Sequence, residues 1–98
     1  MLTAIIVDDE PHAATFLQTK LTQLWPELHI AGTAVNGRQG LQLAAEEQPD
    51  IAFLDIHMPG LSGLEVASAL PQETRIVFVT AFDEFAVEAF QTAAQQQF

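Results

Sequence analysis

A short apolar run that stops at a carboxylate, and is followed at once by turn-forming residues, most constrains the fold of this chain. Ile51–Leu54 has the continuous hydrophobicity of a strand buried on both faces, and Asp55 ends it. Proline and glycine within His57–Gly63 predict a turn, and Leu64 then begins a helical pattern. The stretch therefore predicts a central strand with Asp55 at its carboxyl end, the edge at which open parallel α/β sheets bind ligands.

The rest of the chain repeats this alternation of strand and helix. Apolar runs predict further strands over 2–7, 28–35 and 76–79, and the second, which contains Gly32, is expected at an edge. Helical spacing of apolar residues predicts helices over 11–24, from about 41 to before Pro49, over 63–70 and from Asp83 onward. The pattern predicts one α/β domain over residues 1–98, a flavodoxin-like, doubly wound parallel sheet of strand order 2-1-3-4.

The predicted core follows from the same spacing. The strand over 76–79 is expected to be buried, and Trp25 and the phenylalanines are most simply core residues. The first helix is expected to bury an apolar stripe that Lys20 interrupts, formed by Ala13, Phe16, Leu17, Leu21 and Leu24.

Charge and composition exclude several functions. Thirteen acidic residues stand against three basic ones, Lys20, Arg38 and Arg75, so the formal net charge is −10. Direct binding of nucleic acid depends on basic side chains that neutralise phosphates, so no direct nucleic-acid partner is expected. The chain has no cysteine for thiol catalysis and no apolar run long enough to cross a bilayer. We therefore expect a cytoplasmic protein without a membrane partner.

Carboxylates follow two of the predicted strands, and these strands are expected to be neighbours. Asp8 and Asp9 end the first strand and Asp55 ends the third, so the three side chains should converge at one edge of the sheet. Such a cluster suits Mg²⁺, which takes hard oxygen ligands. Thr80 would add a hydroxyl at the same rim, and the whole would form a phosphoryl-transfer site. The simpler alternative is that Asp8 and Asp9 only cap the following helix.

Three separated motifs give the chain a recognisable pattern. Val7–Pro11, Phe53–Glu65 and Val79–Phe90, in this order and spacing, resemble a response-regulator receiver domain of two-component signalling. The last motif is most similar to that of receivers that precede a LytTR-type DNA-binding domain. The resemblance implies a module that accepts a phosphoryl group from a histidine kinase, and not a turnover enzyme.

The resemblance also implies roles for individual residues. Asp55 would be the phosphoacceptor, Asp9 would bind Mg²⁺ directly, and Asp8 would help to hold the ion. The backbone carbonyl of His57 would complete the protein ligands.

The two residues that directly follow the fourth predicted strand, Thr80 and Ala81, would carry the response to phosphorylation. In the family a hydroxyl moves toward the phosphoryl group, and Thr80 would supply it here. Ala81 would be the small residue that leaves access to the phosphoryl group. The movement of the hydroxyl and the role of Ala81 are implied by the resemblance alone.

The chain departs from the family pattern after Phe90. The resemblance implies a fifth strand with a lysine that pairs with the phosphoryl group, and then a fifth helix, but Lys20 is the only lysine and lies in the first helix. We therefore expect a truncated receiver with weakened output. The apolar edge at 76–79, or the fourth helix with its phenylalanines, is expected to mediate homo-oligomerisation.

Two other functions are compatible with parts of the pattern. The acidic pocket could be vestigial, which would leave a non-signalling module for interaction or dimerisation. A haloacid-dehalogenase-like phosphatase also uses an aspartate at a strand end with Mg²⁺, but it needs a second acid two residues later. Here Ile56 and His57 follow Asp55, so the phosphatase is disfavoured.

Overall fold

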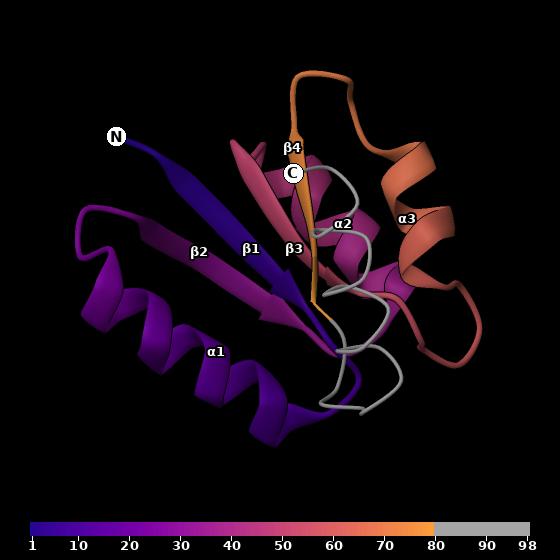
Figure 1. The fold of residues 1–98 in the computed structure, drawn as a ribbon. Coiled ribbons are helices and arrows are strands. Elements are labelled where there is room, and N and C mark those ends of the chain that lie inside the picture. Colours follow the sequence, from indigo (N-terminus) through magenta and orange to yellow (C-terminus); the bar gives the residue numbers. More distant parts are fainter. Residues whose placement is uncertain (80–98) are drawn as a thin grey trace, which may run out of the picture.

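A computed structural model describes residues 1–79 as a parallel sheet flanked by helices (Figure 1). The strands are β1 (Thr3–Val7), β2 (His29–Ala34), β3 (Ile51–Asp55) and β4 (Arg75–Val79). The helices are α1 (Pro11–Leu24), α2 (Gly37–Glu47) and α3 (Gly63–Ala69). Strand and helix alternate as the apolar periodicity predicted. The helix predicted from Asp83 onward lies outside the described residues.

The strand order of the described sheet is β2-β1-β3-β4, and all neighbouring strands are parallel. This confirms the predicted order, including the edge position of β2. In the register, Val7 of β1 pairs with Leu54 of β3, and Asp55 pairs with Val79 of β4. The carboxyl ends of β1 and β3 therefore meet at the same edge, directly before Asp8 and at Asp55.

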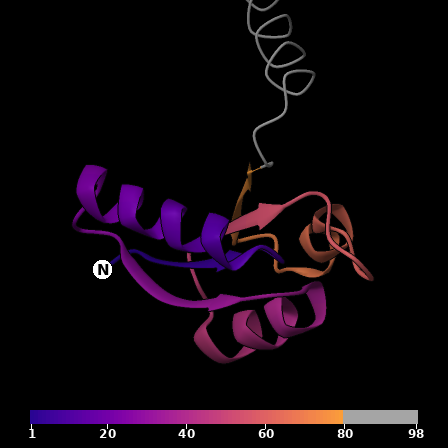
Figure 2. The ribbon, with the colours of Figure 1, turned by 90° about the horizontal axis from the view of Figure 1, so that it is seen from below.

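Alternate residues of the central strands face opposite layers of helices. On one face, Ala4, Ile6 and Phe53 belong to a core cluster with Ala14 and Leu28, and the inner side of α1 packs against it. Figure 2 shows α1 on one side of the sheet and α2 on the other. The cluster on the second face comprises Ile5, Val7, Ala34, Ala44, Ala52, Leu54, Met58 and Val66. Both faces of β1 and β3 are buried, which is why these strands are apolar without alternation.

The predicted stripe of α1 is wrong at two positions. Phe16 is 65% exposed and Leu24 is 81% exposed, whereas Leu17 and Leu21 pack against the core. The helix turns about 100° per residue, so the side that carries Leu17 and Leu21 cannot also carry Phe16. Phe16 instead lies beside Lys20, whose Nζ is 5.5 Å from the ring centroid. Lys20 thus lies over an exposed aromatic ring and does not interrupt a buried face.

The prediction of a buried fourth strand is wrong at Val77 and Phe78. Val77 is 41% exposed and Phe78 is 42% exposed, while Ile76 and Val79 are partly buried against the two clusters. In the described part of the chain β4 ends the sheet, so its second edge has no strand beside it. Within the described residues, the predicted apolar edge is therefore present over residues 76–79.

Helix α2 begins at Gly37, earlier than the apolar spacing predicted, because its first four residues, Gly37–Gly40, include two glycines and no apolar side chain. Asn36 is the N-cap, and its Oδ1 accepts a hydrogen bond from the Gln39 N–H at 2.8 Å. Gly40 lies against Val7, so a Cβ there would be 2.8 Å from the Val7 Cγ1 atom. Close packing on β1 explains a glycine that helix propensity alone disfavours.

None of the helices within residues 1–79 is long and apolar enough to cross a membrane.

We expect Gly40→Ala to destabilise the fold. The added methyl group would strike the stiff, fully buried Val7 side chain, at a cost of about 1–3 kcal/mol. Better helix propensity would return about 1 kcal/mol. Urea unfolding followed by Trp25 fluorescence measures the net change. Gln42→Ala, at an exposed position of the same helix, is the control and should change the free energy of unfolding by less than about 0.5 kcal/mol. Equal effects of the two substitutions would contradict the packing account.

Candidate phosphoryl-transfer site

Asp8 and Asp9 follow the last residue of β1 and differ in exposure. Asp8 is 8% exposed; its N–H donates to the Ala34 carbonyl oxygen at 3.0 Å, and its Oδ1 accepts from the Glu10 N–H at 2.9 Å. Asp9 is exposed. The N-cap of α1 is Glu10, whose Oε1 accepts from the His12 N–H at 3.4 Å. The simpler alternative, in which Asp8 and Asp9 cap the helix, is therefore wrong.

Asp55 is the last residue of β3 and is 7% exposed. Its Oδ1 accepts a hydrogen bond from the His57 N–H at 3.3 Å, so the backbone of the following loop holds the carboxylate. The His57 side chain is exposed. Because Leu54 before it is fully buried in the core, Asp55 is the point at which the strand passes from the core to the rim of the sheet.

The three carboxylates converge as predicted. One oxygen from each of Asp8, Asp9 and Asp55 lies within 4.8 Å of the others. Mg²⁺ binds oxygen ligands at about 2.0–2.1 Å in an octahedron, so its ligand oxygens are about 3–4 Å apart. Small side-chain adjustments would bring this set to that spacing, and the all-oxygen donors match the preference of the ion. The residues present therefore fit a divalent cation.

The cluster is electrostatically costly without a cation. Burial raises the pKa of the Asp55 carboxyl above its ordinary value, and the charges of Asp8 and Asp9 and a side-chain contact with Asp9 raise it further. The hydrogen bond from the His57 N–H acts in the opposite direction, but the net pKa is raised. Repulsion between like charges at short distance is the reason that such groups resist ionising together.

The loop from β3 to α3 is held against Asp55 by Gly63. A Cβ built on Gly63 would lie 2.1 Å from the Asp55 backbone oxygen, and the Gly63 N–H donates to the Ile56 carbonyl at 3.0 Å. Ser62 caps α3: its Oγ accepts from the Glu65 N–H, and Glu65 Oε1 accepts from the Ser62 N–H. The sequence analysis did not predict the positioning role of Gly63. The Ser-x-x-Glu pattern of a capping box, which marks the start of α3, is present in the sequence.

Three further residues were predicted at the site: Thr80, Ala81 and His57. Thr80 and Ala81 lie outside the described residues. The backbone of His57 is at the site, through its N–H on Asp55. Its carbonyl as a metal ligand stays a prediction.

Comparison with known proteins identifies the family. Residues 4–98 match the sequence profile described as the response regulator receiver domain, so the chain belongs to the receiver domain family of response regulators. An uncharacterized response regulatory protein of Vibrio cholerae is 47% identical over 95 residues, which are 94% of this chain and 36% of that protein. The transcriptional regulatory protein BtsR of Escherichia coli is 44% identical over 96 residues, which are 96% of this chain and 40% of BtsR.

Solved receiver structures share the fold. The signal receiver domain of a modulated diguanylate cyclase from Desulfovibrio desulfuricans superposes with a TM-score of 0.71 at 32% identity, covering 97% of this chain and 75% of that one. The response regulator TrrA of Thermotoga maritima, in complex with Mg²⁺-BeF, gives 0.73 at 33% identity, covering 90% of this chain and 76% of TrrA. The flavodoxin-like fold is confirmed. The chain spans about two fifths of the length of the curated relatives it matches.

Asp55→Asn should stabilise the protein at neutral pH in the absence of divalent cations. The raised pKa of Asp55 means that the native state holds this proton more tightly than the unfolded chain does. Wild-type stability therefore falls as pH rises from the ordinary carboxyl pKa of 3.8 through the raised value, and the loss is complete above it. Asparagine keeps an oxygen to accept the His57 N–H and carries no charge.

Urea unfolding with EDTA, from about pH 4 to about pH 8, checks this expectation. The excess stability of Asp55→Asn over wild type should grow with pH and then level off. Glu27→Gln removes one charge at an exposed position away from the cluster and should not produce this pH-dependent gain. A difference between Asp55→Asn and wild type that is constant across the range would contradict the account.

Gly63→Ala should disturb both folding and the site. The added carbon would strike the Asp55 backbone, and backbone cannot rotate aside, so we expect a loss of about 1–3 kcal/mol in stability. Mg²⁺ affinity, followed by calorimetry, should fall as well, because the clash displaces the residue that carries the central carboxylate. Leu64→Ala, at a 58% exposed neighbour, should leave the affinity unchanged. Unaltered Mg²⁺ binding by folded Gly63→Ala would refute the positioning role.

Proposed function

We propose that this receiver domain accepts a phosphoryl group on Asp55 from a histidine kinase, with Mg²⁺ bound beside it. The observation that carries the proposal is the convergence of Asp8, Asp9 and Asp55 at the carboxyl edge of the sheet. A carboxylate ringed by two others is a poor structural element, because its neighbours oppose its charge. The same arrangement suits a nucleophile that works with a bound cation.

In the proposed site, Asp9 binds the ion directly and Asp8 helps to hold it, while Asp55 and the His57 backbone carbonyl supply further oxygens. The exposure of Asp9 and the burial of Asp8 support this division, since one carboxylate faces the solvent side and the other is anchored by the Glu10 N–H. Bound Mg²⁺ would neutralise negative charge on the transferred group. The structure of TrrA with Mg²⁺-BeF supports the same chemistry by similarity.

Asp55 would act as the nucleophile. Its carboxylate oxygen would form a bond to phosphorus while the bond from phosphorus to the kinase histidine nitrogen breaks, and the electron pair would leave with that nitrogen. The His57 N–H on Oδ1 holds one carboxylate oxygen in place, which orients the group for attack by the other. The transfer is onto the protein itself, so the domain is proposed as a phosphoacceptor and not as a turnover enzyme.

The response to phosphorylation is proposed to begin at Thr80, as the hydroxyl that bonds the phosphoryl group, with Ala81 leaving access to it.

The relatives support the proposal that the domain works as part of a transcriptional regulator. BtsR is a transcriptional regulatory protein, and the last motif resembles receivers that work with a LytTR-type DNA-binding domain. Because this chain carries a net charge of −10, contact with DNA would belong to such a partner domain. Self-association through β4 is proposed in addition, since Val77 and Phe78 are exposed on the last strand of the described sheet.

Incubation with acetyl phosphate and Mg²⁺, followed by intact mass, tests the proposal. Wild type should gain one phosphoryl group and Asp55→Asn none, because the nucleophile is gone. EDTA should abolish the gain. Asp9→Asn should slow it by at least about tenfold, because the ion loses a charged ligand.

Glu27→Gln serves as the matched control, since it removes one carboxylate outside the cluster and should be labelled like wild type. Equal labelling of Asp55→Asn and wild type would show that another residue is the acceptor. Labelling that is unaffected by EDTA would remove the role of the cation.

A further inference from the structure

We propose that a groove between α2 and α3, which we call the α2–α3 groove, binds a basic amphipathic peptide segment of a partner protein. The groove lies at the amino ends of β3 and β4, so it is at the opposite edge of the sheet from Asp55. Its volume is about 770 Å³. Cavities of a few hundred to about 1,000 Å³ are large enough to bury several side chains of a ligand. The site is independent of the proposed phosphoryl transfer.

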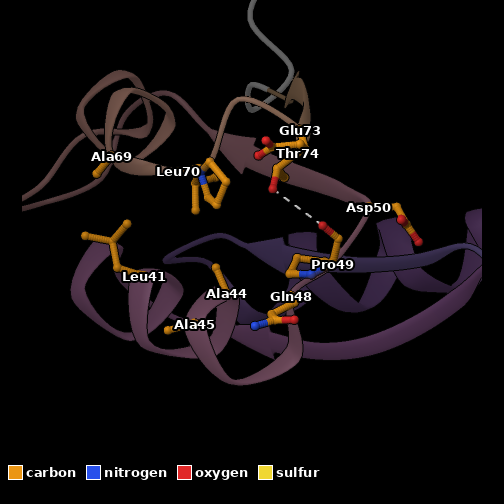
Figure 3. Close-up of a pocket in the computed structure, with 11 residues that line it drawn as sticks. Leu41, Ala44, Ala45, Gln48, Pro49, Asp50, Ala69, Leu70, Glu73 and Thr74 are labelled. Carbon is orange, nitrogen blue, oxygen red and sulfur yellow. Dashed lines mark hydrogen bonds between the residues drawn. The ribbon is translucent and has the colours of Figure 1, made fainter.

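The floor of the groove is apolar and continuous with the core. Ala44 and Pro49 are buried, and Leu41 and Leu70 are partly buried and pack against the cluster that contains Val7 and Val66. Figure 3 shows Leu41 and Ala44 on α2 across the open space from Leu70. The floor is therefore an apolar surface, anchored on the core cluster, against which an apolar side chain of a ligand could pack.

The rim of the groove is acidic. Glu73 and Asp50 line it, and both are exposed. Asp50 already has a structural role, since its Oδ2 accepts from the Thr3 N–H at 2.8 Å. Glu73, in the loop before β4, forms no ion pair with any residue of the described range. Figure 3 places it above the groove, beside Thr74, whose hydroxyl donates to the Pro49 carbonyl oxygen at 3.5 Å.

The charges indicate the chemistry of the occupant. None of the three basic residues of the chain, Lys20, Arg38 and Arg75, lines the groove. A second copy of this chain offers only three basic residues beside thirteen acidic ones, so it matches an acidic rim less well than a basic segment does. A segment with an apolar side chain for the floor and a lysine or arginine for Glu73 complements both parts.

Gln48 supplies a variant that separates binding from folding. It is the C-cap of α2, has φ 47° in the left-handed region, and its side chain lines the groove. Glycine adopts this conformation without the steric penalty that a Cβ imposes. Gln48→Gly should therefore raise the urea midpoint of unfolding while it removes one wall of the groove. Weaker binding by a more stable variant cannot be ascribed to misfolding.

The probe is an N-acetylated, fluorescently labelled hexapeptide of alternating leucine or phenylalanine and arginine, titrated into the 98-residue chain. Fluorescence anisotropy should show saturable binding, and amide chemical shifts should change at Leu41, Ala45, Leu70 and Glu73. Glu73→Lys should weaken binding by about fivefold or more, since it reverses a rim charge. Gln48→Gly should also weaken binding, and Asp55→Asn should leave it unchanged.

The matched control is Glu27→Lys, which makes the same charge change between α1 and β2, away from the groove. It should retain wild-type affinity. Equal weakening by Glu27→Lys and Glu73→Lys would show that only net charge attracts the peptide, and would overturn the proposal. Chemical-shift changes centred elsewhere would also overturn it. So would equal binding of a peptide in which glutamate replaces each arginine. Saturable binding of an alkylamine, without binding of the peptide, would overturn it as well.

Discussion

Repulsion among three carboxylates is the constraint on which the proposed function of this domain depends. The parallel register of β1 and β3 brings Asp8, Asp9 and Asp55 within 4.8 Å of one another, and burial raises the pKa of Asp55. Burial in the core offsets this repulsion, because the central strands are covered on both faces by layers of helices. A bound cation would reduce the repulsion among these carboxylates, so the arrangement suits a site for a cation.

Glycines allow the backbone to approach closely enough to build the site. Gly63 brings the start of α3 against the Asp55 backbone, and Gly40 brings α2 onto Val7. Gly37 does the same between α2 and the β3–α3 loop, where a Cβ would lie 2.6 Å from the Leu61 Cβ. The elements around the acidic edge therefore pack closely at three positions that leave no room for a side chain, against backbone atoms at Gly63 and mainly against side-chain atoms at Gly37 and Gly40.

The two edges of the sheet present different surfaces. The carboxyl edge gathers charged groups around a buried carboxylate, whereas the amino edge between α2 and α3 offers an apolar floor with exposed acids at its rim. The two edges are separated by the length of the strands, so a ligand bound at one edge does not block the other. The strong net negative charge of the chain favours cationic ligands at both, a metal ion at one and basic side chains at the other.

The sequence alone determined the alternation of strands and helices, because this follows from apolar periodicity. The strand order and the convergence of Asp8, Asp9 and Asp55 followed from it once a doubly wound parallel sheet was assumed. The sequence did not predict the exposure of Phe78, the packing of Gly40 on Val7 or the role of Gly63. Those features depend on which surfaces meet across the sheet. Only the tertiary structure decided them, since contacts between segments far apart in sequence leave no local period in the chain.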